Sequence, residues 1–123
     1  MGFRPNFGVS GLQLVGSVSA FALQNATPTI LTYTTPNDGK VHPLLVAASL
    51  VVATLEVGGA VTLAIAGGQS VIIFGSAKAV GTYGLPDLLD SPLLVPANTV
   101  VTISQTAALT SGAATVTAQI FGA

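Results

Sequence analysis

The chain has 123 residues and a mass of 12.2 kDa, enough for one domain around a single core, and half of its residues are hydrophobic. Only 6% are charged, against about 25% in an ordinary soluble domain, and three scattered basic residues give nucleic-acid binding no electrostatic basis. The absence of cysteine excludes disulfides, thiolate zinc sites and thiol nucleophiles. Because a net charge of −1 gives copies little mutual repulsion, we expect other copies or another protein to cover much of the surface.

Residues 1–11 show no hydrophobic periodicity and contain several glycines and a proline. Their large apolar side chains are Phe3 and Phe7, with one cation, Arg4. We expect an extended N-terminal arm that anchors the domain on a partner through these three residues, and a disordered terminus is the alternative interpretation. Residues 12–123 are then expected to form a single β-sandwich domain.

The first two predicted strands cover residues 12–24 and 29–34. The first contains Gly16, and a glycine inside a strand pattern often marks a bulge. The second is a run of β-branched and aromatic residues, which favour strands. Asn, Asp, Gly and Lys at residues 37–40 then predict a turn.

Residues 44–66 form a long apolar stretch that invites interpretation as a transmembrane helix. Only twelve apolar-leaning residues precede Glu56, however, whereas a bilayer requires about 20. Two glycines follow at 58 and 59, and beyond them large and small residues alternate with the period of a strand. We therefore predict a β-hairpin with its turn at residues 56–59, and its core-facing side chains are Val61, Leu63 and Ile65.

Residues 70–74 predict a largely buried strand, and residues 75–92 form the longest irregular region. The pattern allows a short helical turn at residues 86–89. We propose this region as an interface loop whose residues are Leu85, Asp87, Leu88, Leu89 and Asp90. The two carboxylates are too few for a calcium site, which needs about six or more oxygen ligands.

Three strands complete the predicted fold, at residues 93–96, 99–105 and 114–121. In the last of these, Thr115, Thr117 and Gln119 face one way while Val116, Ala118 and Ile120 face the other. About eight strands with regularly spaced turns and no long helix predict an all-β protein. The expected architecture is an antiparallel β-sandwich or small barrel, jelly-roll-like, with the extended arm at its N-terminus.

The ionisable residues do not form a catalytic set. His42 is the single histidine, so several histidines cannot share a metal. It is either a base paired with Asp38 or a strand-entry residue near solvent, and we favour the second interpretation. We expect neither enzymatic activity nor a bound metal, cofactor or small-molecule substrate.

Residues 35–123 resemble the small jelly-roll proteins that decorate or cement the capsids of tailed bacteriophages. The resemblance lies in a turn that leads through His42 into a long strand, in a strand that begins at a Gly-Gly pair, and in the pattern of the last two strands. The corresponding segments are residues 36–42, 58–63, 95–103 and 112–120. The middle of this chain is more apolar, and its charges fewer, than is usual in that group.

The resemblance implies a non-enzymatic virion protein that is assembled in the host cytoplasm. It would bridge neighbouring capsomers as a homotrimer or higher oligomer bound to a major capsid protein, with the arm as an anchor. No nucleic acid or membrane partner is expected. Two alternatives stay open: a component of the phage tail or fibre, and a carbohydrate-binding β-sandwich with an exposed aromatic platform.

Overall fold

The computed structural model describes residues 12–68, 70–75, 79–84 and 93–122. These residues contain strands and no helix. The strands are β1 (Gln13–Ala22), β2 (Thr29–Thr34), β3 (His42–Gly58), β4 (Val61–Ile65), β5 (Ser70–Phe74), β6 (Gly81–Gly84), β7 (Leu93–Val95), β8 (Val100–Gln105) and β9 (Leu109–Gly122).

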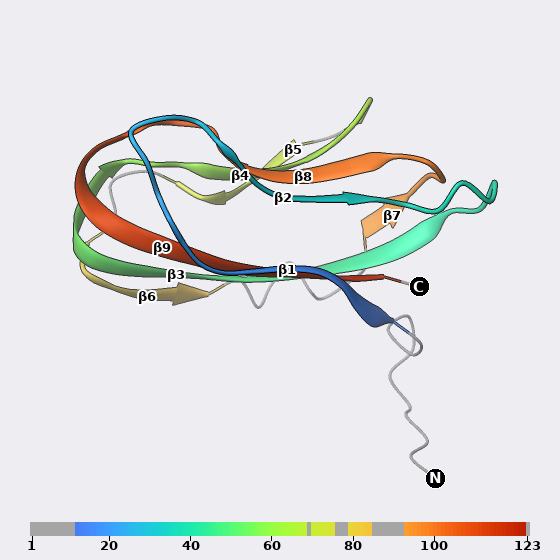
Figure 1. Cartoon of the computed structure of the whole chain (residues 1–123), viewed down its shortest axis with the longest axis horizontal. Coiled ribbons are helices and arrows are strands. Elements are labelled where there is room, and N and C mark those ends of the chain that lie inside the picture. Colours follow the sequence, from blue (N-terminus) through green and yellow to red (C-terminus); the bar gives the residue numbers. More distant parts are fainter. Residues whose placement is uncertain (1–11, 69, 76–78, 85–92, 123) are drawn as a thin grey trace, which may run out of the picture.

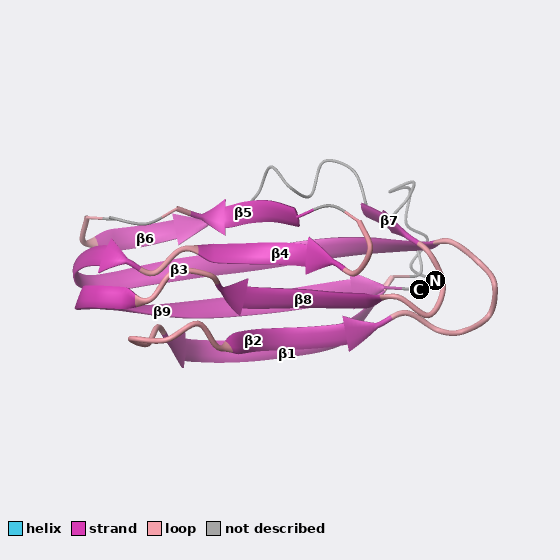
Figure 2. Ribbon diagram, turned by 90° about the horizontal axis from the view of Figure 1, so that it is seen from above, coloured by secondary structure: helices cyan, strands magenta, loops and turns pink. Residues whose placement is uncertain are grey.

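The strands form two antiparallel sheets that face each other and run along the same long axis (Figures 1 and 2). Sheet A has the order β1-β9-β3-β6, with β7 also on β3, and sheet B has the order β2-β8-β4-β5. The pairing is nested: β1 pairs with β9, β2 with β8, β3 with β6 and β7, and β4 with β5. A long hairpin rolled into two sheets gives this order, which is that of a jelly roll.

The all-β sandwich expected from the sequence is therefore confirmed, with one more strand than the approximate count of eight. The difference arises opposite β3, where two separate strands pair along its length. One of them, β6, pairs with residues 49–52 of β3, and the other, β7, pairs with residues 42–44. The prediction placed β6 inside an irregular region, because two glycines in its four residues hide a strand pattern.

The core lies between the sheets and is built from alternate residues of their central strands. In β9 the predicted alternation is confirmed, with Val116, Ala118 and Ile120 fully buried. In β4, Val61 and Leu63 are buried as predicted, and Ile65 packs partly buried against the same cluster. The fully buried large side chains of the other central strands include Leu44, Leu50, Val101 and Ile103.

The hairpin predicted for residues 44–66 is wrong, although both of its strands exist. Since β3 belongs to sheet A and β4 to sheet B, the two strands do not pair with each other. Gly58 and Gly59 both have positive φ, 83° and 80°, and carry the chain from one sheet to the other. A Gly-Gly pair indicates a change of chain direction, but it does not indicate whether the strands on either side pair with each other. Within the described residues, no helix long and apolar enough to cross a bilayer is found.

At the end of the sandwich where this crossing occurs, β3 and β9 bend together toward sheet B (Figure 1). Their pairing contains register shifts here, which accompany bending of a strand pair. The bend depends on glycine at two positions. A Cβ on Gly112, where φ is 91°, would collide with the carbonyl oxygen of Leu55, and one on Gly58 would collide with that of Ala108.

Edge strands account for two further outcomes. The bulge predicted at Gly16 is confirmed, because the register of β1 on β9 shifts between Leu14 and Gly16. The prediction that residues 70–74 are largely buried is wrong in part. Strand β5 is the edge of sheet B, so only Ile73 and Phe74 are buried and Ile72 is 67% exposed.

Candidate interaction surface

The outer face of sheet A, which points away from sheet B, differs in composition from most protein surfaces. Across the five strands of this sheet, the sequence contains one carboxylate, Glu56, and no lysine or arginine. Hydroxyl, amide and apolar side chains make up the rest. Taking a charged group out of water is expensive unless it is paired, so this face can be covered at little electrostatic cost.

At one end of this face, apolar side chains line up across neighbouring strands. Phe121 on β9 pairs with Leu14 on one side and with Leu45 on the other. Next to Leu45, Pro43 pairs with Leu94 of β7. Leu14 is 51% exposed and Leu94 is 70% exposed. We call these five residues the apolar row.

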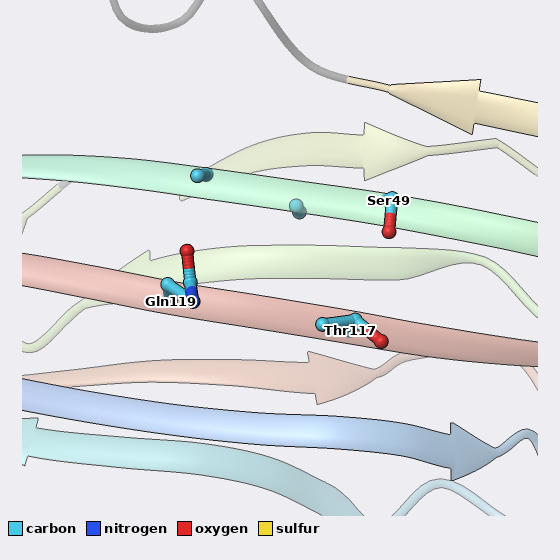
Figure 3. Close-up of a pocket in the computed structure, with 5 residues that line it drawn as sticks. Ser49, Thr117 and Gln119 are labelled. Carbon is cyan, nitrogen blue, oxygen red and sulfur yellow. The ribbon is translucent and has the colours of Figure 1, made fainter.

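Beside the apolar row lies a shallow depression of about 180 Å³, lined by Ala47, Ala48, Ser49, Thr117 and Gln119. Figure 3 shows Ser49 on β3 beside Thr117 and Gln119 on β9. The depression lies over the small side chains of β3, where Ala47 pairs with Gln119 and Ser49 pairs with Thr117. It is smaller than the pockets of about 300–1,000 Å³ that hold small molecules. We call it the central groove.

A backbone irregularity of β1 is fixed at the edge of the central groove. Ala20 has a φ of 52°, and its N–H donates to Oγ1 of Thr117 at 3.0 Å. The register of β1 on β9 shifts here, between Val18 and Phe21. The hydroxyl of Thr117 therefore has a structural partner, whereas the amide of Gln119 points outward from a central strand.

Beyond the central groove, the far end of β3 exposes three more apolar side chains. Val51, Leu55 and Val57 are between 44% and 56% exposed. We call these three residues the apolar end. Exposed apolar side chains thus occur toward both ends of β3, with small or polar ones between them.

The outer face of sheet B is richer in hydroxyl groups. Its outward positions include Thr32 paired with Thr102, and Ser104 paired with Thr29 and Thr62. Of the described aromatic residues, Phe21, Tyr33, Phe74 and Tyr83 belong to the core or pack against it, and Phe121 lies on the outer face of sheet A. The described sheet faces therefore lack the row of exposed aromatic rings on which a sugar would stack.

His42 is buried, with 6% of its surface exposed, and its Nε2 lies 2.8 Å from Oδ1 of Asp38. The interpretation that we favoured from the sequence, a strand-entry residue near solvent, is right about the strand, because His42 is the first residue of β3, and wrong about solvent. The same Oδ1 accepts the N–H of Lys40 at 3.0 Å. The hydrogen bond from His42, and then that from Lys40, lower the pKa of Asp38 below its ordinary value. The hydrogen bond between Asp38 and His42 connects the turn to the first residue of β3. Within the described residues, no group of three or more His, Cys, Asp or Glu could hold a metal ion.

The residues that the sequence singled out as binding sites lie outside the described part of the chain. They are Phe3, Arg4 and Phe7 of the arm and Leu85, Asp87, Leu88, Leu89 and Asp90 of the interface loop. The apolar row was missed by the sequence analysis. Its outward leucines and phenylalanine could have been noticed as apolar residues at positions that alternate with the core, but their alignment requires the pairing of four strands.

Comparisons with known proteins do not assign the chain to a family. No family model matches it, and neither the curated proteins nor the solved structures contain a match.

Proposed function

We propose that this chain is a structural virion protein of a tailed bacteriophage, which decorates and cements the capsid as a homo-oligomer by bridging capsomers of the major capsid protein. The observation that carries the proposal is the outer face of sheet A. That face combines exposed leucines with an almost complete absence of charge, which is the composition of a surface that is normally covered.

Two further features support an assembly role. The nested strand order is that of a jelly roll, an architecture used by viral capsid proteins as well as by lectins and cupins. Since one fold hosts many functions, the virion assignment draws also on the resemblance of residues 35–123 to capsid decoration proteins. The lectin alternative is disfavoured, because the outward positions of the described strands offer hydroxyls and small residues instead of stacked aromatic rings.

The test is binding of the purified chain to capsids of the phage whose genome encodes it. Particles that lack the protein are mixed with it and pelleted, and the bound protein is quantified against the capsid protein. We expect saturable binding with a fixed number of copies per capsomer, and electron microscopy of labelled protein should place it on the shell. Protein found on tails or fibres would instead assign it to that part of the virion.

A gene of cellular origin with no phage genes around it, or particles that pellet free of the protein, would refute the proposal. The variant Leu94→Glu tests the apolar row, because it places a charge there while leaving the core unchanged. If the apolar row is needed for assembly on the particle, fewer copies of this variant than of the wild type should bind per capsomer.

A further inference from the structure

We infer that the outer face of sheet A binds the same face of a second copy of this chain. In this arrangement a two-fold axis lies between the two copies, parallel to the sheets and perpendicular to their strands, and passes over the central groove, so that the outer faces of the two sheets A lie face to face. The inference deepens the proposed function and rests on its self-assembly, because it names the face through which the copies meet.

The lack of charge on this face favours its contact with a second copy. A face that meets itself brings like against like, so any charged group near the axis would be repelled by its own counterpart. The apolar row and the central groove contain no ionisable side chain. Thus two such faces can come together without burying an unpaired charge.

The outer face of sheet A is also large enough for a specific contact. Residues 43–52 of β3, at about 3.3 Å per residue, extend roughly 33 Å, and four strands spaced about 4.8 Å apart are roughly 19 Å wide. Each copy therefore offers about 600 Å² of flat sheet, and two copies together about 1,200 Å². Specific protein–protein interfaces start at about this area.

The order of side chains along β3 fits the same arrangement. The apolar row reaches β3 at residues 43 and 45, the central groove lies at 47–49, and the exposed Val51 follows. The two-fold axis over the groove reverses this order in the second copy. The apolar row of each copy then lies over Val51 of the other, while Gln119 and Ser49 lie near their own counterparts.

The experiment uses single substitutions at Gln119 in the full chain. Gln119→Glu and Gln119→Lys each place like charges across the axis, so each should weaken dimerisation on the order of thirtyfold or more. Mixing the two variants should restore a dimer that contains one of each. Native mass spectrometry and sedimentation over a range of concentrations measure both effects.

The matched controls are Thr102→Glu and Thr102→Lys, which place the same charges on the central strand of sheet B, facing outward. These variants should dimerise like the wild type. Equal effects at Thr102 and Gln119 would show that charge alone, instead of a contact at the groove, controls association. Circular dichroism confirms that all four variants keep their strands.

A wild-type chain that is monomeric, or that forms a trimer as the resemblance implies, would overturn the inference. If dimers form only after Phe3→Ser and Phe7→Ser are combined, the face is covered by the arm of its own chain instead. Failure of the proposed function is distinguishable: a dimer that depends on Gln119 but binds no capsid would leave this inference intact and refute the capsid role.

Discussion

The two sheets of the sandwich contribute alike to the core but present different outer faces. Each sheet buries alternate Leu, Ile and Val residues of its central strands. Outside, sheet B shows mainly threonine and serine, with Ile72 and Val100 as separate exposed apolar residues, whereas sheet A shows Leu14, Leu45 and Leu94 in one row across its strands. Folding explains the inner faces of both. It does not explain a row of apolar side chains on an outer face, so sheet A carries a second requirement.

The two sheets also differ in the length of their strands. Strands β3 and β9 have 17 and 14 residues, whereas β2, β4, β5 and β8 have five or six. The extra residues of β3 and β9 form the bend toward sheet B and expose the apolar end. Sheet A is thus both the longer sheet and the one whose exposed apolar side chains line up across neighbouring strands.

The largest effect is expected from a charge on the inner face of sheet B. Leu63→Asp places a carboxylate among fully buried residues, where Leu63 itself is 1% exposed. It should reduce the free energy of unfolding by more than about 4 kcal/mol, enough to unfold the domain. Its neighbour Ala64 faces outward, so Ala64→Asp should cost less than about 1 kcal/mol. Urea unfolding measures both, and similar values would mean that the faces of β4 are assigned wrongly.

A somewhat smaller loss is expected where sheet A bends toward sheet B. Gly112→Ala adds a Cβ against the carbonyl oxygen of Leu55 at a φ of 91°, and strain together with collision should cost about 3 kcal/mol. Gly39 also has positive φ, but a Cβ added there would have nothing within 4 Å of it. Gly39→Ala should therefore cost only about 1 kcal/mol. Equal thermal stability of the two variants would contradict the close approach at the bend.

The next largest loss of stability is expected at a side chain that joins the two sheets by hydrogen bonds. Gln105 ends β8 of sheet B and is fully buried. Its Oε1 accepts the N–H of Gln24, which follows β1 of sheet A, and its Nε2 donates to the carbonyls of Gln24 and Ala107. Gln105→Leu removes these partners from the Gln24 N–H and the Ala107 carbonyl, while the Gln24 carbonyl still accepts the N–H of Leu109, and should cost about 2 kcal/mol. Hydrogen exchange should show faster exchange at Gln24, and unchanged protection there would argue against the tie.

The smallest effect concerns the turn that joins β2 of sheet B to β3 of sheet A. The pKa of Asp38 lies below its ordinary value of 3.8, chiefly because of its hydrogen bond with His42. Since this pKa is lower in the folded state, the carboxylate stabilises the fold fully above about pH 4, and the contribution is lost as the pH falls through the lowered pKa. The stability advantage of the wild type over Asp38→Asn should therefore shrink below about pH 4. The other carboxylates are common to both proteins and cancel, so a difference that stays constant from neutral to acid pH would exclude this role.

Much of the fold was predictable because nearly every strand has one face on the core. Runs of β-branched, aromatic and apolar residues located β2 and β5 at both of their ends, and period-two alternation assigned the inner face of β9. Alternation does not specify the partner of a strand, and for that reason Gly58 and Gly59 were interpreted as a hairpin turn. The burial of His42 depends on strands brought together from elsewhere, which no local pattern encodes. The apolar row likewise needs the register of four strands.

Nested pairing has a consequence for how the protein is made. Strands β8 and β9 come last in the sequence, yet each lies inside its sheet, β8 between β2 and β4 and β9 between β1 and β3. Until a ribosome has synthesised them, β1 and β2 have no sheet neighbour at all. Forming contacts between such distant segments is slow. Until they form, the edges of β3 and β4 that pair with β9 and β8 stay exposed and can associate with other unfinished chains. This domain can therefore fold only after β8 and β9 have been synthesised, and its yield in the cell should depend on how fast those edges are closed.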